Sequence, residues 1–416
     1  MTRRIDRRTF LASAAAAALS LATRGYAATP AGVLAAQGAL ASRLVGQLAK
    51  AGGGVTVVSP ASLAGALAVI ALGGDPALQA NLQAVLGFAK SADAAADLDA
   101  LRQATARDGE GLPFSSANAI VFDSALKLVP SALDALAKAG VRASADDFAK
   151  PKTLAAINAW VAERTKGKIE KVLDELPRGG GLVALNALYF KDRWKYQFDP
   201  AETKPAPFRL VGGRTVEVPL MRLSDRTLRF RQSDRFAAVD LPYATAGYSL
   251  IVVTTKREPA PARDFAGLGA WLAGDGFADS PGEVALPRFD ASAGVDLIPA
   301  LAALGFKPPA TLPGFASGPL RIRKVQQRVQ LEVDEEGTVA AAATAAVATR
   351  SAEVGLMKMI ADRPFMFALR DSASGLIIVA GYVANPRHAA PTAERQQRSQ
   401  PARGRRILGL AIPLSG

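Results

Sequence analysis

One stretch of the chain, residues 337–349, restricts more than any other what the protein can fold into. After Glu335 and Glu336 it runs for thirteen residues without a charge, a proline or a side chain larger than valine. Runs typical of β-strands lie on both sides of it, at residues 325–333 and 365–369. Three conformations are compatible with such a uniform set of small side chains.

A surface helix and a flexible linker are the two simpler interpretations. Alanine has the highest helix propensity, but an Ala-rich helix of this length is marginal on its own in water. Five residues weaken it further: Thr338, Val339, Thr344, Val347 and Thr349. Linkers are usually rich in Ser, Gly or Pro, whereas this segment has glycine only at its start.

The third interpretation is an exposed loop that can enter a β-sheet as an additional strand. Small uncharged residues alternate on one side of such a strand: Thr338, Ala340, Ala342, Thr344 and Ala346. No proline removes a donor from the ladder, and Gly337 gives the backbone freedom at the pivot. The segment meets every requirement of a loop that becomes a strand.

The composition excludes several classes of function. The chain has no cysteine and one histidine, His388. Disulfides, cysteine nucleophiles and Cys-ligated zinc are therefore excluded, and a catalytic triad or a His-rich metal site would depend on that single histidine. No Gly-x-Ser-x-Gly, Walker or dinucleotide motif stands in a suitable context. We predict that the protein is not an enzyme and holds no metal or cofactor.

The positive charge is concentrated at the two ends. Of the formal net charge of +13, residues 1–27 carry +4 and residues 387–416 carry +5, which leaves +4 for the body between them. The body has no dense Lys and Arg stripe with interleaved aromatic residues. A nucleic-acid partner is therefore not expected.

Residues 1–27 are typical of an export signal. A charged start is followed by an apolar stretch and by small residues that suit cleavage before Ala28. The stretch is too short and too weakly apolar for a membrane span. Arg7 and Arg8 with the following Thr-Phe-Leu match a twin-arginine signal, and an ordinary secretory signal is the alternative. The predicted location is the periplasm or the extracellular space. Residues 387–416 are predicted to be a basic disordered tail.

The body, residues 28–386, mixes strands and helices without regular βαβ alternation, which favours a single domain with an α+β fold and large sheets. Ser59 and Pro60 suit the start of an apolar helix, and further helices are predicted around residues 157–161 and 296–304. Asn186 lies in an apolar run, so its amide needs a fixed partner. The predicted strands are residues 182–190, 236–241, 249–254, 283–289, 325–333, 365–369 and 376–383.

Nine short motifs, spread over about residues 30–386, make the chain resemble the serpin family. In order they are 59–63 (SPASL), 157–161 (INAWV) with 165–169 (TKGKI), 186–191 (NALYFK) with Trp194 and 198–200 (FDP), 218–221 (VPLM), 241–243 (LPY), 286–289 (LPRF), 334–338 (DEEGT), 362–365 (DRPF), and Gly381 with Asn385-Pro386. Each motif alone has little specificity, but nine in the family's order are specific.

The resemblance implies an α+β fold of three β-sheets and about nine helices with an exposed reactive-centre loop. It also implies a mode of action, that of a bacterial exported protease inhibitor. A serine protease attacks the loop as a substrate, the loop inserts as a central strand of the largest sheet, and the acyl-enzyme is trapped. The implied partner is a target serine protease, and the inhibitor is expected to be a monomer.

The resemblance also assigns residues to two regions. The hinge of the loop is Glu335, Gly337, Thr338, Val339, Ala340, Ala341, Ala342 and Ala343. The region where the sheet opens contains Ser59, Ser62, Asn186, Trp194 and Gln327. Family members often have histidine at the position of Gln327. Glutamine does not titrate, so pH-dependent insertion through this position is in doubt. An asparagine common in the family just before the Ser-Pro pair is Val55 here, and the tail has no counterpart.

Two registers remain open for the scissile bond. The commonest family spacing from Gly337 places it after Ser351, before Ala352, whereas a loop shorter by one residue places it between Arg350 and Ser351. Arg350 is the only large or charged side chain between Glu336 and Glu353, and a trypsin-like pocket carries an Asp that pairs with arginine. We predict the Arg350–Ser351 bond and a trypsin-like target; cleavage after Ser351 would suit an elastase-like protease.

A non-inhibitory serpin, acting as a binding protein or a chaperone, is the alternative function. Such a protein would be expected to have a hinge spoiled by proline, charge or bulk. Residues 337–349 of this chain have none of these.

Overall fold

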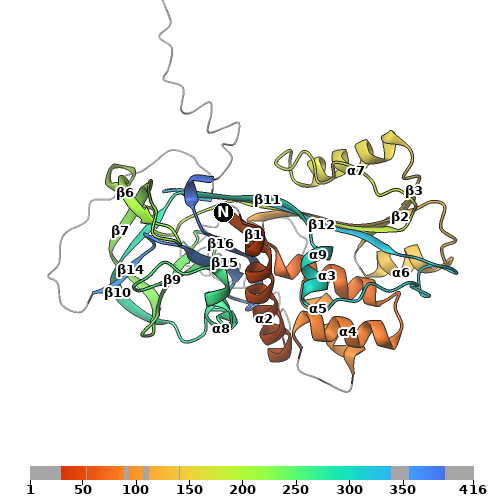
Figure 1. Ribbon diagram of the computed structural model, residues 1–416, viewed down its shortest axis with the longest axis horizontal. Coiled ribbons are helices and arrows are strands. Elements are labelled where there is room, and N and C mark those ends of the chain that lie inside the picture. Colours follow the sequence, from red (N-terminus) through yellow and green to blue (C-terminus); the bar gives the residue numbers. More distant parts are fainter. Residues whose placement is uncertain are drawn as a thin grey trace, which may run out of the picture.

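The computed structural model describes residues 30–52, 54–88, 93–105, 112–139, 141–338 and 356–388 (Figure 1). Its strands form three β-sheets, of nine, five and two strands, which confirms the predicted α+β fold. The described residues contain eight α-helices: α2 (Ala31–Leu48), α3 (Pro60–Ala71), α4 (Pro76–Leu86), α5 (Ala94–Thr105), α6 (Ala132–Lys138), α7 (Pro151–Arg164), α8 (Gly269–Leu272) and α9 (Ile298–Ala303).

The five-stranded sheet has the order β11-β12-β4-β2-β3. Its strands are β2 (Phe114–Asp123), β3 (Arg142–Asp146), β4 (Leu182–Phe190), β11 (Phe289–Asp296) and β12 (Ile322–Val333). Helix α7 lies on one face, while α3, α5, α6 and α9 lie on the other (Figure 1). Every residue of β4 is buried, and a strand covered on both faces needs a continuous apolar run. The sequence prediction of residues 182–190 is therefore confirmed.

The nine-stranded sheet occupies the opposite half of the molecule (Figure 1). Its order is β1-β16-β15-β9-β8-β7-β10-β14, with β6 paired to β7. The strands are β1 (Val55–Val58), β6 (Lys204–Arg209), β7 (Thr215–Gln232), β8 (Phe236–Pro242), β9 (Tyr248–Thr255), β10 (Ala278–Pro287), β14 (Met357–Ile360), β15 (Phe365–Asp371) and β16 (Ile377–Val383). Two short strands, β5 (Asp192–Arg193) and β13 (Gly337–Thr338), form the third sheet.

Two expectations need correction. The predicted strand 283–289 is two strands, because the chain passes at Arg288 from β10 in the nine-stranded sheet to β11 in the five-stranded sheet. The sheet that contains the predicted opening region is also not the largest one. Asn186 and Gln327 lie in the five-stranded sheet, which has fewer strands than the sheet built on β7 and β10.

The residues at the start of helix α3 explain why the helix begins there. The Ser59 side chain accepts a hydrogen bond from Ser62 N at 3.2 Å, and Pro60 occupies the first turn. Both features are as predicted for a helix start. The helix buries its apolar face below the five-stranded sheet. The start of α3 is thereby fixed next to the strands that hold the opening region.

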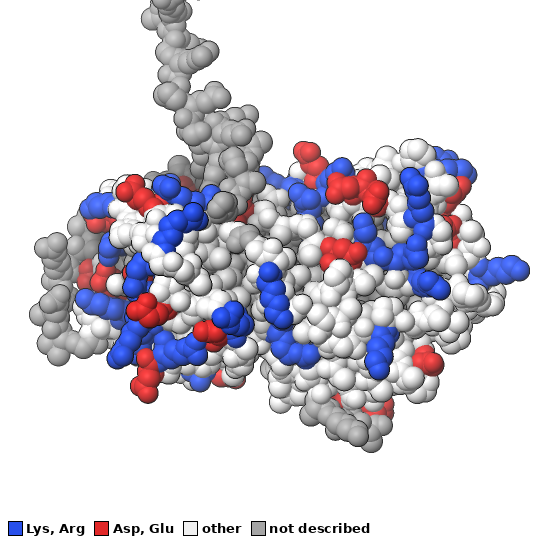
Figure 2. Space-filling view, in the orientation of Figure 1, with Lys and Arg blue, Asp and Glu red and all other residues white. Residues whose placement is uncertain are grey.

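The two main sheets share an apolar core. Phe289 of β11 packs edge-on against Phe365 at 5.5 Å and lies 5.1 Å from Phe367, both in β15 (ring centroids). On the face shown in Figure 2 positive and negative side chains are interspersed. None of the described helices is both long enough and apolar enough to cross a membrane.

Candidate functional site

The predicted hinge begins in a tight turn at the end of β12. Asp334 Oδ1 accepts hydrogen bonds from Glu336 N at 3.0 Å and Gly337 N at 3.2 Å, and Asp334 N donates to Gly337 O at 3.0 Å. The turn reverses the chain direction after Val333. Burial, together with the nearby charges of Glu335 and Glu336, raises the pKa of the Asp334 carboxyl above its ordinary value of 3.8.

Glu335 anchors this turn to the rest of the molecule. Its carboxylate is 7% exposed and accepts from Arg288 Nε at 2.8 Å on both oxygens, with Arg288 Nη2 at 2.6 Å from Oε1. Thr203 Oγ1 donates to the same Oε1 at 2.5 Å. Bidentate guanidinium–carboxylate pairs are among the stronger hydrogen-bonded contacts. Glu335 therefore fixes the base of the loop.

Gly337 fits closely against β5. It pairs with Arg193 in the two-stranded sheet and has a φ of 149°. A Cβ at this position would collide with the backbone of Asp192 and Arg193. Only glycine combines that backbone angle with so close an approach. The predicted pivot is thus also a point of tight backbone contact.

Thr338, the last residue described before the loop, is fully buried. Its hydroxyl lies 2.9 Å from the hydroxyl of Tyr243, and burial raises the pKa of that phenol. The Tyr243 ring stacks on Trp194 with centroids 4.5 Å apart. Trp194 Nε1 in turn donates to Asp334 O at 2.9 Å. An aromatic stack therefore holds both ends of the hinge turn.

The predicted opening region lies in the middle of the five-stranded sheet, where β12 and β4 run parallel to each other. Gln327 and Asn186 are directly opposite each other in the register. The Gln327 amide accepts from Ser59 N at 2.6 Å and donates to Ser59 O at 3.1 Å. Ser59 Oγ donates to Ile378 O at 2.6 Å and lies 2.9 Å from Ser62 Oγ. Gln327 thus ties β12 to the start of α3.

Asn186 has the fixed partner that its burial requires, but this partner lies on β2 and not on β12. Its Nδ2 donates to Asn118 Oδ1 on β2 at 2.7 Å, while its own Oδ1 is buried without a hydrogen bond in the described structure. Three of the five predicted opening residues, Ser59, Ser62 and Gln327, are therefore in contact. Asn186 is their neighbour across the strand pair. Trp194 belongs to the hinge.

Several residues that shape the hinge or the opening region had no assigned role in the sequence analysis. Arg288 and Tyr243 stand in motifs that were noted only as resemblances, whereas Thr203 and Asn118 gave no signal. Their partners lie 47 to 132 residues away in the chain, so no local pattern identifies them.

The remaining predicted residues lie outside the described structure. These are Val339, Ala340, Ala341, Ala342, Ala343, Arg350 and Ser351, together with residues 1–27 and nearly all of 387–416. Within the described residues no cluster of His, Asp or Glu is suited to a metal ion. The site is thus a hydrogen-bonded loop base above a parallel strand pair.

The comparisons with known proteins agree with this architecture. A family model described as "Serpin (serine protease inhibitor)" matches residues 35–386. The chain is 32% identical over 381 residues to Serpin-ZX of Hordeum vulgare, covering 81% of this chain and 92% of that protein. It is 30% identical over 349 residues to the leukocyte elastase inhibitor of Sus scrofa, covering 79% and 92%. The chain therefore belongs to the serpin family, whose members are mostly serine protease inhibitors.

Solved structures show the same fold. The thermophilic serpin Tengpin in its native state matches with a TM-score of 0.73 at 21% identity, over 92% of this chain and 96% of that one. Serpin48 of Tenebrio molitor matches with a TM-score of 0.70 at 24% identity, over 85% and 97%. The sequence relatives named above come from a plant and a mammal, so bacterial export stays a prediction.

Proposed function

We propose that this protein is an exported inhibitor that traps a serine protease covalently and is consumed in doing so. The protease serine Oγ attacks the carbonyl carbon of Arg350 and forms an ester. The bond to the Ser351 nitrogen breaks, and that nitrogen leaves as an amine after taking a proton from the protease's catalytic histidine. Insertion of the loop then separates the ester from the groups that would hydrolyse it. The chain acts as a substrate rather than as an enzyme.

The observation that carries this proposal is the direction in which the chain leaves β12. The turn at Asp334 reverses the chain, so residues 337–349 would run antiparallel to both β12 and β4. Insertion would replace one parallel pairing by two antiparallel ones, which are slightly more stable per residue. Thirteen residues at about 3.3 Å each span about 43 Å, and β12 with its twelve residues is similarly long.

The target is proposed to be a trypsin-like protease. Arg350 supplies a positive charge in an otherwise uncharged loop, and it would pair with the aspartate of a trypsin-like specificity pocket. Cleavage after Ser351 would instead fit an elastase-like protease. A twin-arginine signal in residues 1–27 would place the monomeric inhibitor in the periplasm or outside the cell.

A single reaction tests this function. The full chain is mixed with an equal amount of trypsin and boiled in detergent; a band at the summed mass less that of the released C-terminal fragment is expected, with Ser351 as the N-terminus of that fragment. Thr344→Pro is expected to abolish the band but not the cleavage, because proline cannot complete the sheet ladder. Thr344→Ser is the matched control and keeps the band. Cleavage of the unaltered chain without a covalent band would favour the non-inhibitory alternative. A fragment that begins at Ala352 would show that the scissile bond is Ser351–Ala352.

A further inference from the structure

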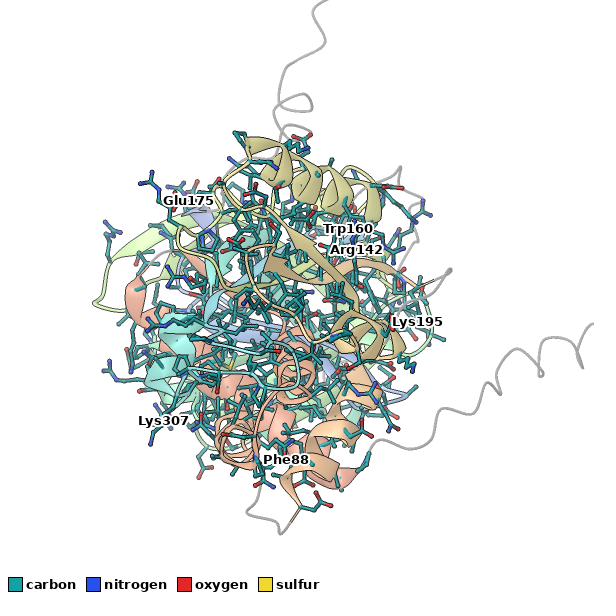
Figure 3. The ribbon with its side chains drawn as sticks, turned by 90° about the vertical axis from the view of Figure 1, so that its right-hand side faces the viewer. Phe88, Arg142, Trp160, Glu175, Lys195 and Lys307 are labelled. Carbon is teal, nitrogen blue, oxygen red and sulfur yellow. The ribbon has the colours of Figure 1, made fainter. Side chains whose placement is uncertain are left out.

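A hollow of about 600 Å³ lies at the end of the five-stranded sheet opposite the hinge, the end that faces the viewer in Figure 3. Its walls come from four segments, at the ends of β2 and β3 and at the starts of β4 and β12: residues 123–126, 147–149, 177–181 and 319–323. The volume is in the usual range of small-molecule sites. Four segments that are distant in the chain thus meet around a space that can hold a ligand.

Three exposed arginines line this hollow: Arg178, Arg321 and Arg323. Arg323 Nη2 donates to Arg178 O at 2.7 Å, and in the described part of the chain no other hydrogen bond or ion pair engages the three guanidinium groups. Each guanidinium has five N–H donors, so most of these donors are available to a ligand. Like charges around one hollow repel one another, and an anion placed between them relieves that repulsion.

A second set of donors comes from the three glycines that precede β4. Gly179, Gly180 and Gly181 line the hollow and have φ angles of 80°, 71° and 125°, which glycine adopts without strain. Among the described residues none accepts a hydrogen bond from these three backbone N–H groups. Gly181 is nevertheless buried, and a buried N–H group rarely lacks an acceptor. Successive backbone N–H groups in a turn form a concave site for an anion.

Two carboxylates also stand in the wall, and both already accept hydrogen bonds. Asp147 Oδ1 accepts from Ala149 N at 2.9 Å, and its Oδ2 lies 3.1 Å from Lys150 Nζ. Asp123 Oδ1 accepts from Ala125 N at 2.9 Å. With Lys150 included, four cations stand against two carboxylates, which leaves an excess of two positive charges. The hollow therefore favours a ligand with at least two negative charges.

We propose that this hollow binds an organic phosphate with two or more negative charges. The phosphate groups would lie between the arginines and the glycine N–H groups, because both kinds of donor match phosphate oxygens. The volume of about 600 Å³ is larger than two phosphate groups fill, and the apolar side chains of Leu126 and Phe148 in the wall would contact the organic part. No residue of the hinge or of the opening region lines the hollow, so binding here does not depend on the proposed function.

Calorimetric titration of the full chain with ADP, in a buffer free of phosphate and sulfate, tests the site. One molecule of ADP is expected to bind per chain. Arg321→Gln should weaken ADP binding about tenfold, the scale of one lost hydrogen bond to a charged group. Arg328→Gln removes an exposed charge from the same strand outside the hollow and is the matched control, with ADP affinity unchanged. No binding by the unaltered chain, or equal weakening by the two variants, overturns the site.

A variant with the opposite effect separates loss of the site from loss of the fold. Asp123→Asn keeps an acceptor for Ala125 N and removes a negative charge from the wall. ADP should bind this variant several-fold more tightly than the unaltered chain, because a like charge no longer repels the phosphates. A misfolded chain cannot produce tighter binding. Weaker or unchanged binding by Asp123→Asn, when its thermal unfolding matches that of the unaltered chain, would contradict phosphate binding at this wall.

Inorganic pyrophosphate separates the phosphate groups from the organic part. It has the two phosphates of ADP without the ring systems, so we expect the unaltered chain to bind it several-fold less tightly than ADP. Phe148→Leu should remove most of that difference and leave pyrophosphate affinity unchanged. Equal affinity for ADP and pyrophosphate in the unaltered chain would overturn the contact with an organic part. Because no protease enters these titrations, failure to trap trypsin would count against the proposed function and not against this site.

Discussion

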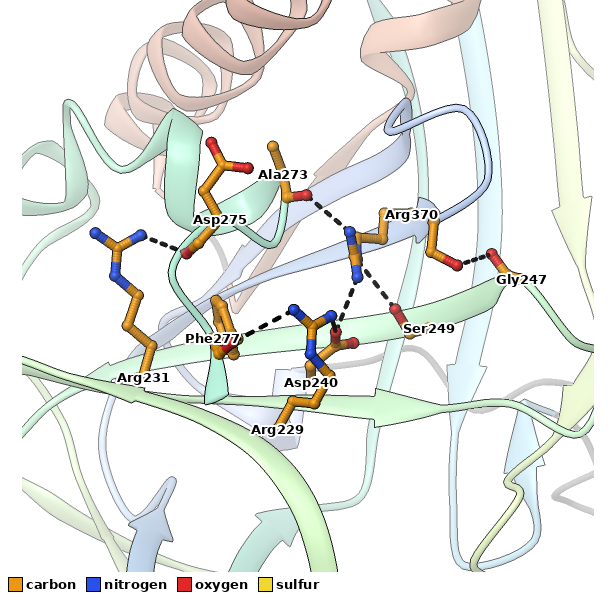
Figure 4. Close-up of polar contacts among 10 residues, drawn as sticks. Arg229, Arg231, Asp240, Gly247, Ser249, Ala273, Asp275, Phe277 and Arg370 are labelled. Carbon is orange, nitrogen blue, oxygen red and sulfur yellow. Dashed lines mark hydrogen bonds and ion pairs between the residues drawn. The ribbon is translucent and has the colours of Figure 1, made fainter. Parts of the chain in front are cut away.

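The β4–β12 strand pair and the middle of the nine-stranded sheet are held together in opposite ways. In the nine-stranded sheet, Asp240 of β8 accepts from Arg370 of β15 at 2.9 Å and from Arg229 of β7 at 3.0 Å (Figure 4). Arg370 also donates to Ser249 of β9 and to Ala273 O beyond α8. One buried network thus crosses four neighbouring strands.

No comparable bond crosses between β12 and β4 at their polar pair. Gln327 and Asn186 face each other in the register, yet each is hydrogen-bonded away from the other, to Ser59 and to Asn118. The backbone ladder and apolar packing hold the two strands together at this point. Parting the strands at this point therefore breaks no ion pair, whereas separating β15 from β8, across β9, would break that of Arg370 with Asp240. The strand separation that the proposed function requires would therefore break fewer polar contacts in the five-stranded sheet than in the nine-stranded sheet.

The strongest test of this contrast removes Arg370. Arg370→Met leaves Asp240, which is 5% exposed, with the half-exposed Arg229 as its remaining partner. Loss of one member of a buried ion pair costs about 3–5 kcal/mol. The free energy of unfolding, from urea denaturation, is expected to fall by that amount. The exposed Arg263, 3.7 Å from Asp264, is the control, and Arg263→Met should cost less than about 1 kcal/mol. Equal losses would show that the network does not fasten the sheet.

The second test loosens the base of the loop. Glu335→Gln keeps an acceptor for Thr203 but loses the ionic bond to Arg288. We expect a loss of about 2 kcal/mol, the scale of hydrogen bonds to a charged group. Because the contact is local, the effect should appear as faster hydrogen exchange at Gly337 and Thr338, with the nine-stranded sheet unchanged. Glu332→Gln, three residues earlier on β12, is the matched control. Uniformly faster exchange throughout the protein would contradict a local anchor.

The β4–β12 strand pair with its hinge is easier to predict from the sequence than the nine-stranded sheet. Strand β4 is identifiable from its residues alone, because burial on both faces demands an unbroken apolar run. The hinge stays a prediction, which rests on the absence of proline, charge and bulk that a loop entering a sheet requires. Strand β7 was not predicted: its eighteen residues carry several arginines, and its burial pattern is irregular around a β-bulge.

The partners of the hinge could not be predicted for a different reason. Arg288 is placed by the point at which the chain changes sheets, and Thr203 by a short 3-10 helix that precedes β6. Each meets Glu335 only after the two sheets have packed together. Residues brought together in this way have no common pattern in the sequence, so the structure is needed to find them.

The third test introduces a titratable group at the strand pair. In Gln327→His, a neutral imidazole can replace at most part of the double hydrogen bond to Ser59, so a loss of about 1 kcal/mol is expected at pH 7.5. Protonation removes the acceptor for Ser59 N and buries a charge, which lowers the histidine pKa in the folded state. Stability is then lost further as the pH falls through the unfolded value of about 6.5. Thermal unfolding between pH 7.5 and 5.5 measures this, with Gln326→His one residue earlier as control. A parallel profile for both variants would contradict a special role of this position.

The smallest expected effect comes from Asp334, whose pKa is raised by burial and by two acidic neighbours. Between its ordinary pKa of 3.8 and its raised value, the folded state binds more protons than the unfolded state, so stability rises as the pH falls through that window. Asp334→Asn keeps an acceptor for Glu336 N and Gly337 N without the charge. The variant should be more stable than the unaltered chain at pH 7, by less than about 1 kcal/mol, and the difference should vanish below the window. Asp192→Asn, at a half-buried position of β5, is the control. A stability difference that persisted at low pH would mean that the variant had changed the hydrogen bonds of the turn and not its charge. The hinge would then resemble the nine-stranded sheet, because specific hydrogen bonds, and not the protonation of Asp334, would determine its stability.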